Sequence, residues 1–581
     1  MSTPLRDGTD AVSPCRGLPD VASLKLQDAR HVDDQRRAGD SPKPPTLDQL
    51  PTEIVEHILG YFEQPLPVNL YELQYPRLYH PPARHAWNTR QKAVQSLRLV
   101  CRRLHDLASP LLFPYVSLSL DQESLDAVDR ISRRPYLAAG VRGVMVDQTC
   151  RDGALVNGQP PFTDFKRALV EELRTYAADF YHDTHEFADD EGGHEEDKAR
   201  ARLGLRNFRV MCNAWRANYF IPDGDESDDL VSDAAEAQKY VDLLRRGRAA
   251  YARAFEKQVR LVSDGTFLRV LAAAFARMPR LDTVNVGRRR LRLYANCRDQ
   301  HRVLTDDDEL ERFVESQAWS RPETPPNNMF VEVLLATHAA GRRLRHIYAE
   351  DARLGTHVAV ARSDEGADED IGEKLRAVSQ ALESVHLFFD ERLDPAEASF
   401  VDDYASTVTS GRELRALVLE GHARYHSMHR VELTSHARCL TTADWPCLRK
   451  LHVYYAAVSQ TDLEALCGGL RDGSLHNLLL VFVFLISGLW ADVLDALRSK
   501  VSGGEGCTVR VLRPMGAEMR DLVKLHVIED EATRSAWESQ GFARLEPIVT
   551  QRAEWYLAGD PRAPVNPFRG ELDEEHCKLR H

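Results

Sequence analysis

Apolar positions near the N-terminus of the chain predict two short amphipathic helices. Ile54, Ile58 and Phe62 repeat every four residues, which is the spacing of one face of a helix. The same helical spacing returns over residues 93–107. The intervening residues 64–88 are rich in Pro, Tyr and His and predict an irregular insertion.

The next part of the chain, residues 114–280, predicts two short strands followed by a mainly helical region. Strands are expected at 116–120 and 141–146, where apolar residues recur in short runs. A helix is expected between them, over 123–133, and helical spacing dominates from 165 to 278. Four acidic stretches are predicted to be solvated loops; they cover 183–197, 223–236, 306–311 and 363–373.

The C-terminal half repeats a short pattern, Leu-x-x-apolar-x-apolar. The pattern begins at Leu281, Leu344, Leu382, Leu414, Leu448 and Leu475. Helix-like pieces such as TDLEALCGGLR and WADVLDALRSK follow the later copies. One strand and one helix in roughly 20–30 residues form the unit of a leucine-rich repeat. Residues 281–535 are therefore predicted to form an irregular repeat region, and 536–581 a C-terminal helix and tail.

Composition and charge restrict the possible partners. The chain has 75 basic and 89 acidic residues, a net charge of −14, which argues against a nucleic-acid or anionic-membrane binder. Residues 1–45 are predicted to be disordered. The longest apolar run, 478–489, is shorter than the ~20 residues of a membrane helix. With ten cysteines and no C-x-x-C pair, we expect free thiols and a cytoplasmic or nuclear protein that needs no membrane.

Motifs of catalysis or metal binding are not found. His182, His185 and Glu186 do not have the H-E-x-x-H spacing of a zinc site. The glycines of 502–508 lack the lysine of a phosphate-binding loop and predict a loop before a strand. The cluster Arg288-Arg289-Arg290 is expected to be a solvated turn. We therefore expect no enzyme, no catalytic residue, no metal and no cofactor.

Two segments carry a more specific pattern. LDQLPTEIVEHILGYF (47–62) holds Leu50-Pro51 followed by Glu53, and SLRLVCRRLHDLASPLLF (96–113) holds VCRRLHDLA. These features resemble the F-box, the module that docks on a Skp-type adaptor of cullin-based (SCF) ubiquitin ligases. The layout to residue 146 resembles large fungal-type F-box proteins with degenerate leucine-rich-like repeats. Residues 46–113 would then form the F-box, with 64–88 longer than the usual connection.

The resemblance implies an α/β fold and a function. The fold would combine all-α F-box helices with an irregular leucine-rich-repeat-like α/β solenoid. The chain would be a non-catalytic substrate receptor of an SCF-type ligase. It would bind the adaptor, and through it a cullin, and would hold a target protein on its repeats. The expected adaptor-contacting residues are Leu50, Pro51, Glu53, Ile54, Ile58, Leu59, Val100, Cys101 and Leu104.

The repeat pattern also predicts where a target would bind. Side chains alternate along a strand, so the leucines face the helices and the residues between them face the open side. This rule selects Tyr348, His386 and His452 as a tentative target-binding set. Two other functions stay open: an adaptor-binding protein that acts outside ubiquitination, and, less favoured, a metal-dependent enzyme that uses the acidic stretches as ligands.

Overall fold

The structure, a computed structural model, describes most of the chain beyond residue 49. The described residues are 50–63, 81–147, 151, 153–157, 161–186, 195–217, 234–287, 303–316, 329–349, 367–388, 405–421, 423–427, 430–435, 437–442, 444–504, 506–517 and 542–569. They belong to two units, Met1–Pro51 and Thr52–His581. The predicted disordered segment 1–45 and the cluster Arg288-Arg289-Arg290 lie outside the described residues.

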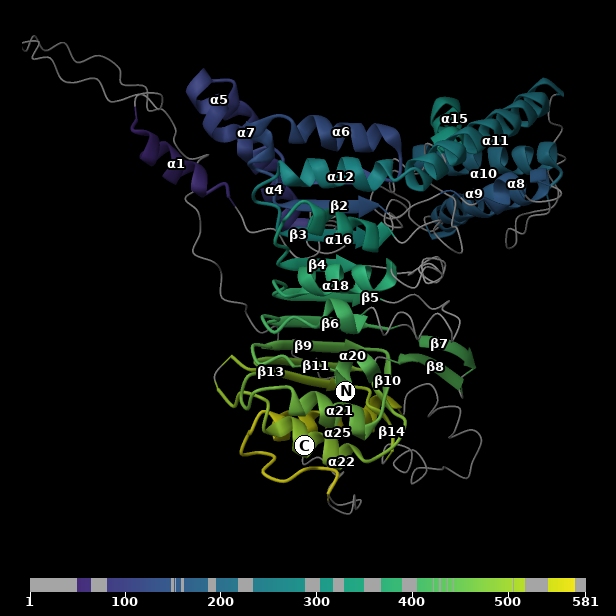
Figure 1. The fold of residues 1–581 in the computed structure, drawn as a ribbon. Coiled ribbons are helices and arrows are strands. Elements are labelled where there is room, and N and C mark those ends of the chain that lie inside the picture. The colour runs from purple at the N-terminus through teal and green to yellow at the C-terminus, as the bar shows by residue number, and fades with distance from the viewer. Residues whose placement is uncertain are drawn as a thin grey trace, which may run out of the picture. The chain divides into compact units, whose positions relative to one another are not determined.

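A nine-stranded sheet, parallel throughout, is the centre of the second unit (Figure 1). Its strands are β1 Tyr115–Ser119, β2 Gly143–Asp147, β3 Thr283–Gly287, β4 His346–Ala349, β5 Ser384–Phe388, β6 Ala416–Glu420, β9 Lys450–Tyr454, β11 Asn477–Val481 and β13 Thr508–Leu512. Their order across the sheet follows their order in the chain. The fold class is therefore α/β, and all six repeat-pattern strands are confirmed as neighbours in one sheet.

Each strand of this sheet puts two apolar side chains on the same face. They are Val116 and Leu118, Val144 and Val146, Val284 and Val286, Ile347 and Ala349, Val385 and Leu387, Leu417 and Leu419, Leu451 and Val453, Leu478 and Leu480, and Val509 and Val511. All are buried in one core that runs along the sheet. The alternation follows from the two-residue period of a strand.

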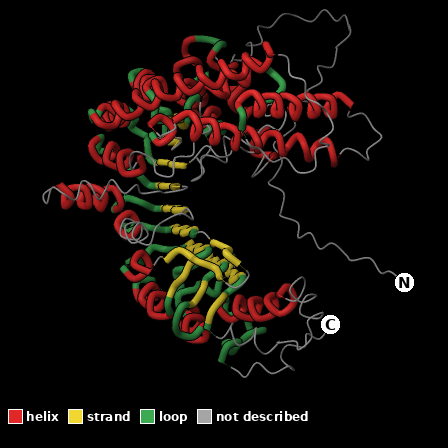
Figure 2. Tube along the Cα trace, turned by 90° about the vertical axis from the view of Figure 1, so that its right-hand side faces the viewer, coloured by secondary structure: helices red, strands yellow, loops and turns green. Residues whose placement is uncertain are grey.

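Helices cover that apolar face. They are α6 Gln122–Ser132, α7 Pro135–Ala138, α12 Thr266–Ala276, α16 Met329–Ala339, α18 Ala367–Ser379, α20 Ala437–Thr441, α21 Gln460–Gly468, α22 Trp490–Arg498 and α25 Phe542–Leu557. Figure 2 shows them along one side of the strands, except α25, which contacts β13 and α22 at the end of the sheet. Trp445 Nε1 donates to the Thr409 carbonyl at 2.7 Å, and Trp490 Nε1 donates to the Met515 carbonyl at 3.0 Å. These bonds satisfy the polar atoms of two fully buried tryptophans.

A second helical core is formed by helices that lie on either side of β3 in the chain. It is built by α8 Ala154–Asn157, α9 Pro161–Glu186, α10 Glu195–Trp215, α11 Ala234–Ser263 and α15 Asp307–Ser316. Its buried residues, which include Phe165, Phe208 and Tyr251, form a cluster separate from the core of the sheet. The predicted mainly helical region is confirmed.

All four acidic stretches predicted as loops are partly helical, since residues 183–186 end α9, 195–197 begin α10 and 234–236 begin α11. Residues 307–311 begin α15, where the Asp306 carboxylate accepts hydrogen bonds from the amides of Asp308 (3.0 Å) and Glu309 (3.3 Å). Residues 367–373 lie in α18. Acidic side chains stabilise the first turn of a helix through its free amides and its dipole, so an acidic run can start a helix as well as form a loop.

A five-stranded second sheet was not expected from the sequence. Its strands are β7 Ala423–Ser427, β8 Arg430–Ser435, β10 Ala456–Val458, β12 Phe484–Leu485 and β14 Met515–Gly516, in the order β14-β12-β10-β8-β7. Three of them follow a strand of the large sheet after a corner residue with positive φ: Tyr455 (53°), Phe482 (52°) and Arg513 (52°). Residues other than glycine rarely adopt this conformation, so composition did not reveal the corners.

The N-terminal helices differ from the expected pattern in two places. They are α1 Thr52–Gly60, α4 Pro81–Arg98 and α5 Arg102–Ala108, followed by the 3-10 turn Ser109–Leu111. Residues 64–80 of the predicted irregular insertion lie outside the described residues, and residues 81–88 are helical. The single helix predicted over 93–107 is interrupted at residues 99–101. Helical spacing alone did not reveal that break, because both pieces share the same apolar period.

One glycine fixes the approach of the 3-10 turn to the first strands. A β-carbon at Gly140 would lie 1.7 Å from the Pro110 carbonyl oxygen. We expect Gly140→Ala to lower the free energy of unfolding by about 1–3 kcal/mol, because the backbone must move to relieve the overlap. The control Gly372→Ala lies in α18 with open space around it and is expected to raise stability by about 0.5–1 kcal/mol. Equal urea midpoints for Gly140→Ala and the wild type would contradict the predicted clash.

Candidate interaction surfaces

The three N-terminal helices bury one set of apolar side chains within the chain itself. Val55 and Leu59 of α1, Val94 of α4, and Leu104 and Ala108 of α5 are all buried. Helix α1 contacts α5, and α4 also contacts α5. Arg103 Nη2 donates to Thr52 Oγ1 at 2.8 Å across the contact between α1 and α5. These contacts hold the helices together without any partner.

The same helices leave a second set of apolar side chains exposed. Ile54 is 48% exposed, Tyr61 74%, Leu99 86% and Val100 61%; Ile58 is half-buried. We call these five residues the N-terminal apolar surface. Ile54, Ile58 and Tyr61 belong to α1 and the turn after it, and Leu99 and Val100 to the turn between α4 and α5. Clustered exposed apolar side chains are typical of a protein contact site.

The expected adaptor-contacting residues divide between the inner and outer sides. Ile54 and Val100 are on the exposed side, and Ile58 is half-buried. Leu59 and Leu104 are buried in the chain's own interior, so they support the helices and are not available to a partner in this structure. Glu53 is exposed in the first turn of α1. Leu50 is half-buried and Pro51 exposed at the end of the first unit.

Cys101 has a local structural role. It is half-buried, and its Sγ accepts a hydrogen bond from the Leu104 amide at 3.5 Å at the start of α5. The Cys101 thiol therefore caps the start of α5. The cap accounts for the direction change between α4 and α5, since it satisfies one of the free amides of the new helix.

Charged residues attach the N-terminal helices to the large sheet. Arg280, just before β3, forms an ion pair with Glu63, just after α1. Arg90 of α4 is nearly buried. Burial lowers the pKa of Arg90 and of Arg142; Arg142 lowers that of Arg90 further, whereas Glu63 opposes the shift for both. Glu63 therefore joins α1, α4 and the strand starts in one electrostatic cluster.

The second surface is the face of the large sheet opposite the buried leucines, which we call the open face. Tyr348 of β4 is the register partner of His386 of β5. His386 pairs with Val418 of β6, and Val418 pairs with His452 of β9. The structure thus places Tyr348, His386 and His452 in one row on one face.

Side chains of this row contact one another and the next row. The rings of Tyr348 and His386 meet edge to face with 4.5 Å between centroids. His452 Nε2 lies 2.9 Å from Asn477 Oδ1, and Tyr454 Oη lies 3.5 Å from His452 Nδ1. The contacts order the histidine rings before any partner binds.

Burial changes what these residues can do. Tyr348 is only 7% exposed, so the direct partner contact expected of it is not available in this structure; His386 and His452 are half-buried. Burial lowers the pKa of His452, although the hydrogen bond to Asn477 opposes the shift. Burial likewise lowers the pKa of His346, although the nearby Asp282 carboxylate opposes the shift. Neutral imidazoles are therefore favoured at both positions.

The open face has three rows: the first holds His346, Ser384, Ala416 and Lys450, and the second holds Tyr348, His386, Val418 and His452. Sequence reasoning missed the third row. Phe388, Glu420 and Tyr454 occupy equivalent positions at the ends of β5, β6 and β9. The signal was present: continuing the strand alternation two residues past His386, Val418 and His452 reaches these three. Their omission came from ending the repeat pattern at its last apolar position.

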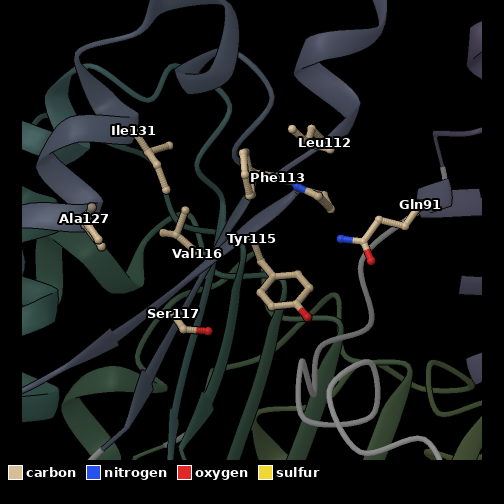
Figure 3. Close-up of a pocket in the computed structure, with 10 residues that line it drawn as sticks. Gln91, Leu112, Phe113, Tyr115, Val116, Ser117, Ala127 and Ile131 are labelled. Carbon is tan, nitrogen blue, oxygen red and sulfur yellow. The ribbon is translucent and has the colours of Figure 1, made fainter. Parts of the chain in front are cut away.

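A pocket of about 260 Å³ lies beside β1, the first strand of the large sheet (Figure 3). Phe113, Tyr115, Val116 and Ile131 supply most of its wall, and the Gln91 amide faces it from α4. None of its ten lining residues is Asp, Glu, His, Cys or Lys. The lining therefore offers apolar contact and hydrogen bonds but no strong acid–base group.

Over the described part of the chain, no three His, Cys, Asp or Glu residues lie together as a metal-binding group. The side chains of His182, His185 and Glu186 fall outside the described residues. Burial raises the pKa of Cys212 to about 12 and that of Cys467 to about 11, so both thiols are protonated at neutral pH. In this part of the chain no helix combines the length and apolarity needed to span a membrane.

No protein-family model matches this chain, and no curated protein matches it significantly.

The depressed histidine pKa values predict how stability depends on pH. Below the unfolded value of about 6.5, the unfolded chain binds protons at His346 and His452 that the folded chain does not. The free energy of unfolding should therefore fall as the pH is lowered through 6.5 toward the folded-state pKa values. The double variant His346→Gln/His452→Gln should lose stability less steeply in urea titrations at about pH 5.5–7. Identical slopes for variant and wild type would contradict the assignment, and titrations near pH 8 provide the reference.

Proposed function

We propose that the chain is a substrate receptor of an SCF-type ubiquitin ligase. Residues 52–108 would act as an F-box that docks on a Skp-type adaptor, and the large sheet would present the target. The observation that carries the proposal is the N-terminal apolar surface. The helices that hold L-P-x-E and V-C-R-R expose Ile54, Leu99 and Val100 after their other faces are buried.

The energetics of these helices favour a partner at that surface. Burying apolar area stabilises a complex by roughly 25 cal/mol per Å², and isolated short helices gain little stability by themselves. A helical adaptor that covers Ile54, Leu99 and Val100 would remove three exposed apolar side chains of this region from water. Leu59 and Leu104 would contribute indirectly, by holding α1 and α5 in place.

The succession of strands and helices supports the second half of the proposal. We interpret it as a degenerate leucine-rich-repeat-like solenoid, in which each strand–helix unit buries its apolar row against its neighbours. Such arrays expose one continuous strand face for protein recognition. The chain itself would perform no reaction. Its contribution to ubiquitination would be proximity, because it holds the target near the conjugating enzyme and so raises the effective concentration of the two reactants.

Charge placed on the N-terminal apolar surface should abolish adaptor binding. We expect Ile54→Glu and Val100→Glu, separately, to weaken binding of a purified Skp-type adaptor by about 100-fold or more, because an unpaired carboxylate would be buried at the contact. The control Val565→Glu changes an equally exposed valine far along the chain and should bind normally. Calorimetry with the full chain measures all three affinities. Undiminished adaptor binding by both N-terminal variants would refute the F-box assignment.

A second measurement separates a ligase receptor from an adaptor-binding protein that acts elsewhere. If the chain works in an SCF ligase, a reconstituted mixture with adaptor and cullin should yield a ternary complex in size-exclusion chromatography. With the Ile54→Glu variant, the chain should elute separately from both the adaptor and the cullin. A stable chain–adaptor pair that excludes the cullin would favour the role outside ubiquitination.

A further inference from the structure

We propose that Glu420, between Phe388 and Tyr454 on the open face, binds a lysine or arginine side chain of the target. This inference rests on the proposed function, since it names the chemistry of the partner at the sheet. It concerns the third row of the open face, at the C-terminal ends of β5, β6 and β9.

The register places a carboxylate between two aromatic rings. Phe388 of β5 is the register partner of Glu420, and Glu420 is the register partner of Tyr454 of β9. Adjacent strands are about 4.8 Å apart, so all three side chains leave the same face side by side. The Phe388 and Tyr454 side chains are half-buried, and the Glu420 side chain is 33% exposed. The row is therefore accessible but partly shielded from water.

Glu420 differs in its charge balance from two carboxylates beside this sheet, Glu383 just before β5 and Glu554 of α25. Glu383 pairs with Arg345 at 2.7 Å, and Glu554 pairs with Arg510 at 3.2 Å. Among the residues whose side chains the structure describes, the ion pair of Glu420 is with His386 Nε2 at 3.5 Å, and no lysine or arginine pairs with it. A histidine at that distance compensates a carboxylate only when it is protonated. Glu420 is thus a carboxylate without a permanent cation.

A long cationic side chain satisfies all three members of the row. Its ammonium or guanidinium group can bind the Glu420 carboxylate by charge-assisted hydrogen bonds, while the ring faces of Phe388 and Tyr454 attract the same cation. Its aliphatic stem can cover the rings. Burial, together with the Glu420 charge, raises the pKa of Tyr454, so its ring remains a neutral phenol. An acidic partner would meet repulsion from Glu420, which gives the surface its selectivity.

The test uses a positional peptide library and the purified full chain. Each pool fixes the central residue as Lys, Arg, norleucine, Gln or Glu within a degenerate background, and bound peptide is quantified. We expect the wild type to prefer Lys or Arg over norleucine by about tenfold, from the ion pair and the ring contacts together. Glu420→Gln should abolish the preference, and Glu420→Lys should reverse it toward Glu.

Matched variants make the outcome decisive. Glu413→Gln removes an exposed carboxylate that pairs with Arg343 just before β6 and should keep the wild-type preference. Tyr454→Leu should reduce the preference by about threefold, and it decides the question if Glu420→Gln fails to fold. A wild type with no cation preference, a preference that survives in Glu420→Gln, or an undiminished preference in Tyr454→Leu would overturn the proposal. Adaptor binding is measured on the same samples, so failure of the F-box assignment would be recognised separately.

Discussion

The burial of two apolar side chains per strand against the helical layer is the interaction on which the rest of the second unit depends. Neighbouring parallel strands cannot be joined by a short turn. After each strand the chain must therefore cross back to the edge of the sheet where the strands begin. Leu417 and Leu419 illustrate the result, because both are fully buried under that layer. Fully burying such a side chain stabilises the fold by roughly 1.5–3 kcal/mol, and nine strands repeat the arrangement.

This core determines what the opposite face can do. Once the leucines fix the register, the residues between them form rows spaced by the strand separation of about 4.8 Å. Tyr348, His386 and His452 share one such row, and Phe388, Glu420 and Tyr454 share the next. A recognition surface built on strands keeps its geometry without a partner. Its specificity comes from side chains that contribute little to the core.

The two candidate surfaces are joined through packed and charged contacts within the second unit. Glu63 pairs with Arg280 beside β3, and the half-buried Arg142 adjoins the same cluster. The helices α9, α10 and α11 are inserted between β2 and β3, and together with α15, which follows β3, they keep their own buried cluster. Because the inserted helices satisfy their own apolar residues, β2 and β3 still pair directly in the sheet.

Local patterns in the sequence were sufficient for the strands and many helices, because alternation and helical spacing depend only on neighbouring residues. The repeat pattern from Leu281 to Leu475 therefore located six strands correctly. The break at residues 99–101 and the left-handed corners at Tyr455 and Phe482 were decided by packing around them. The place of Glu420 between Phe388 and Tyr454 was decided by pairing among β5, β6 and β9. Only the tertiary structure sets such a register, since it joins residues more than thirty positions apart along the chain.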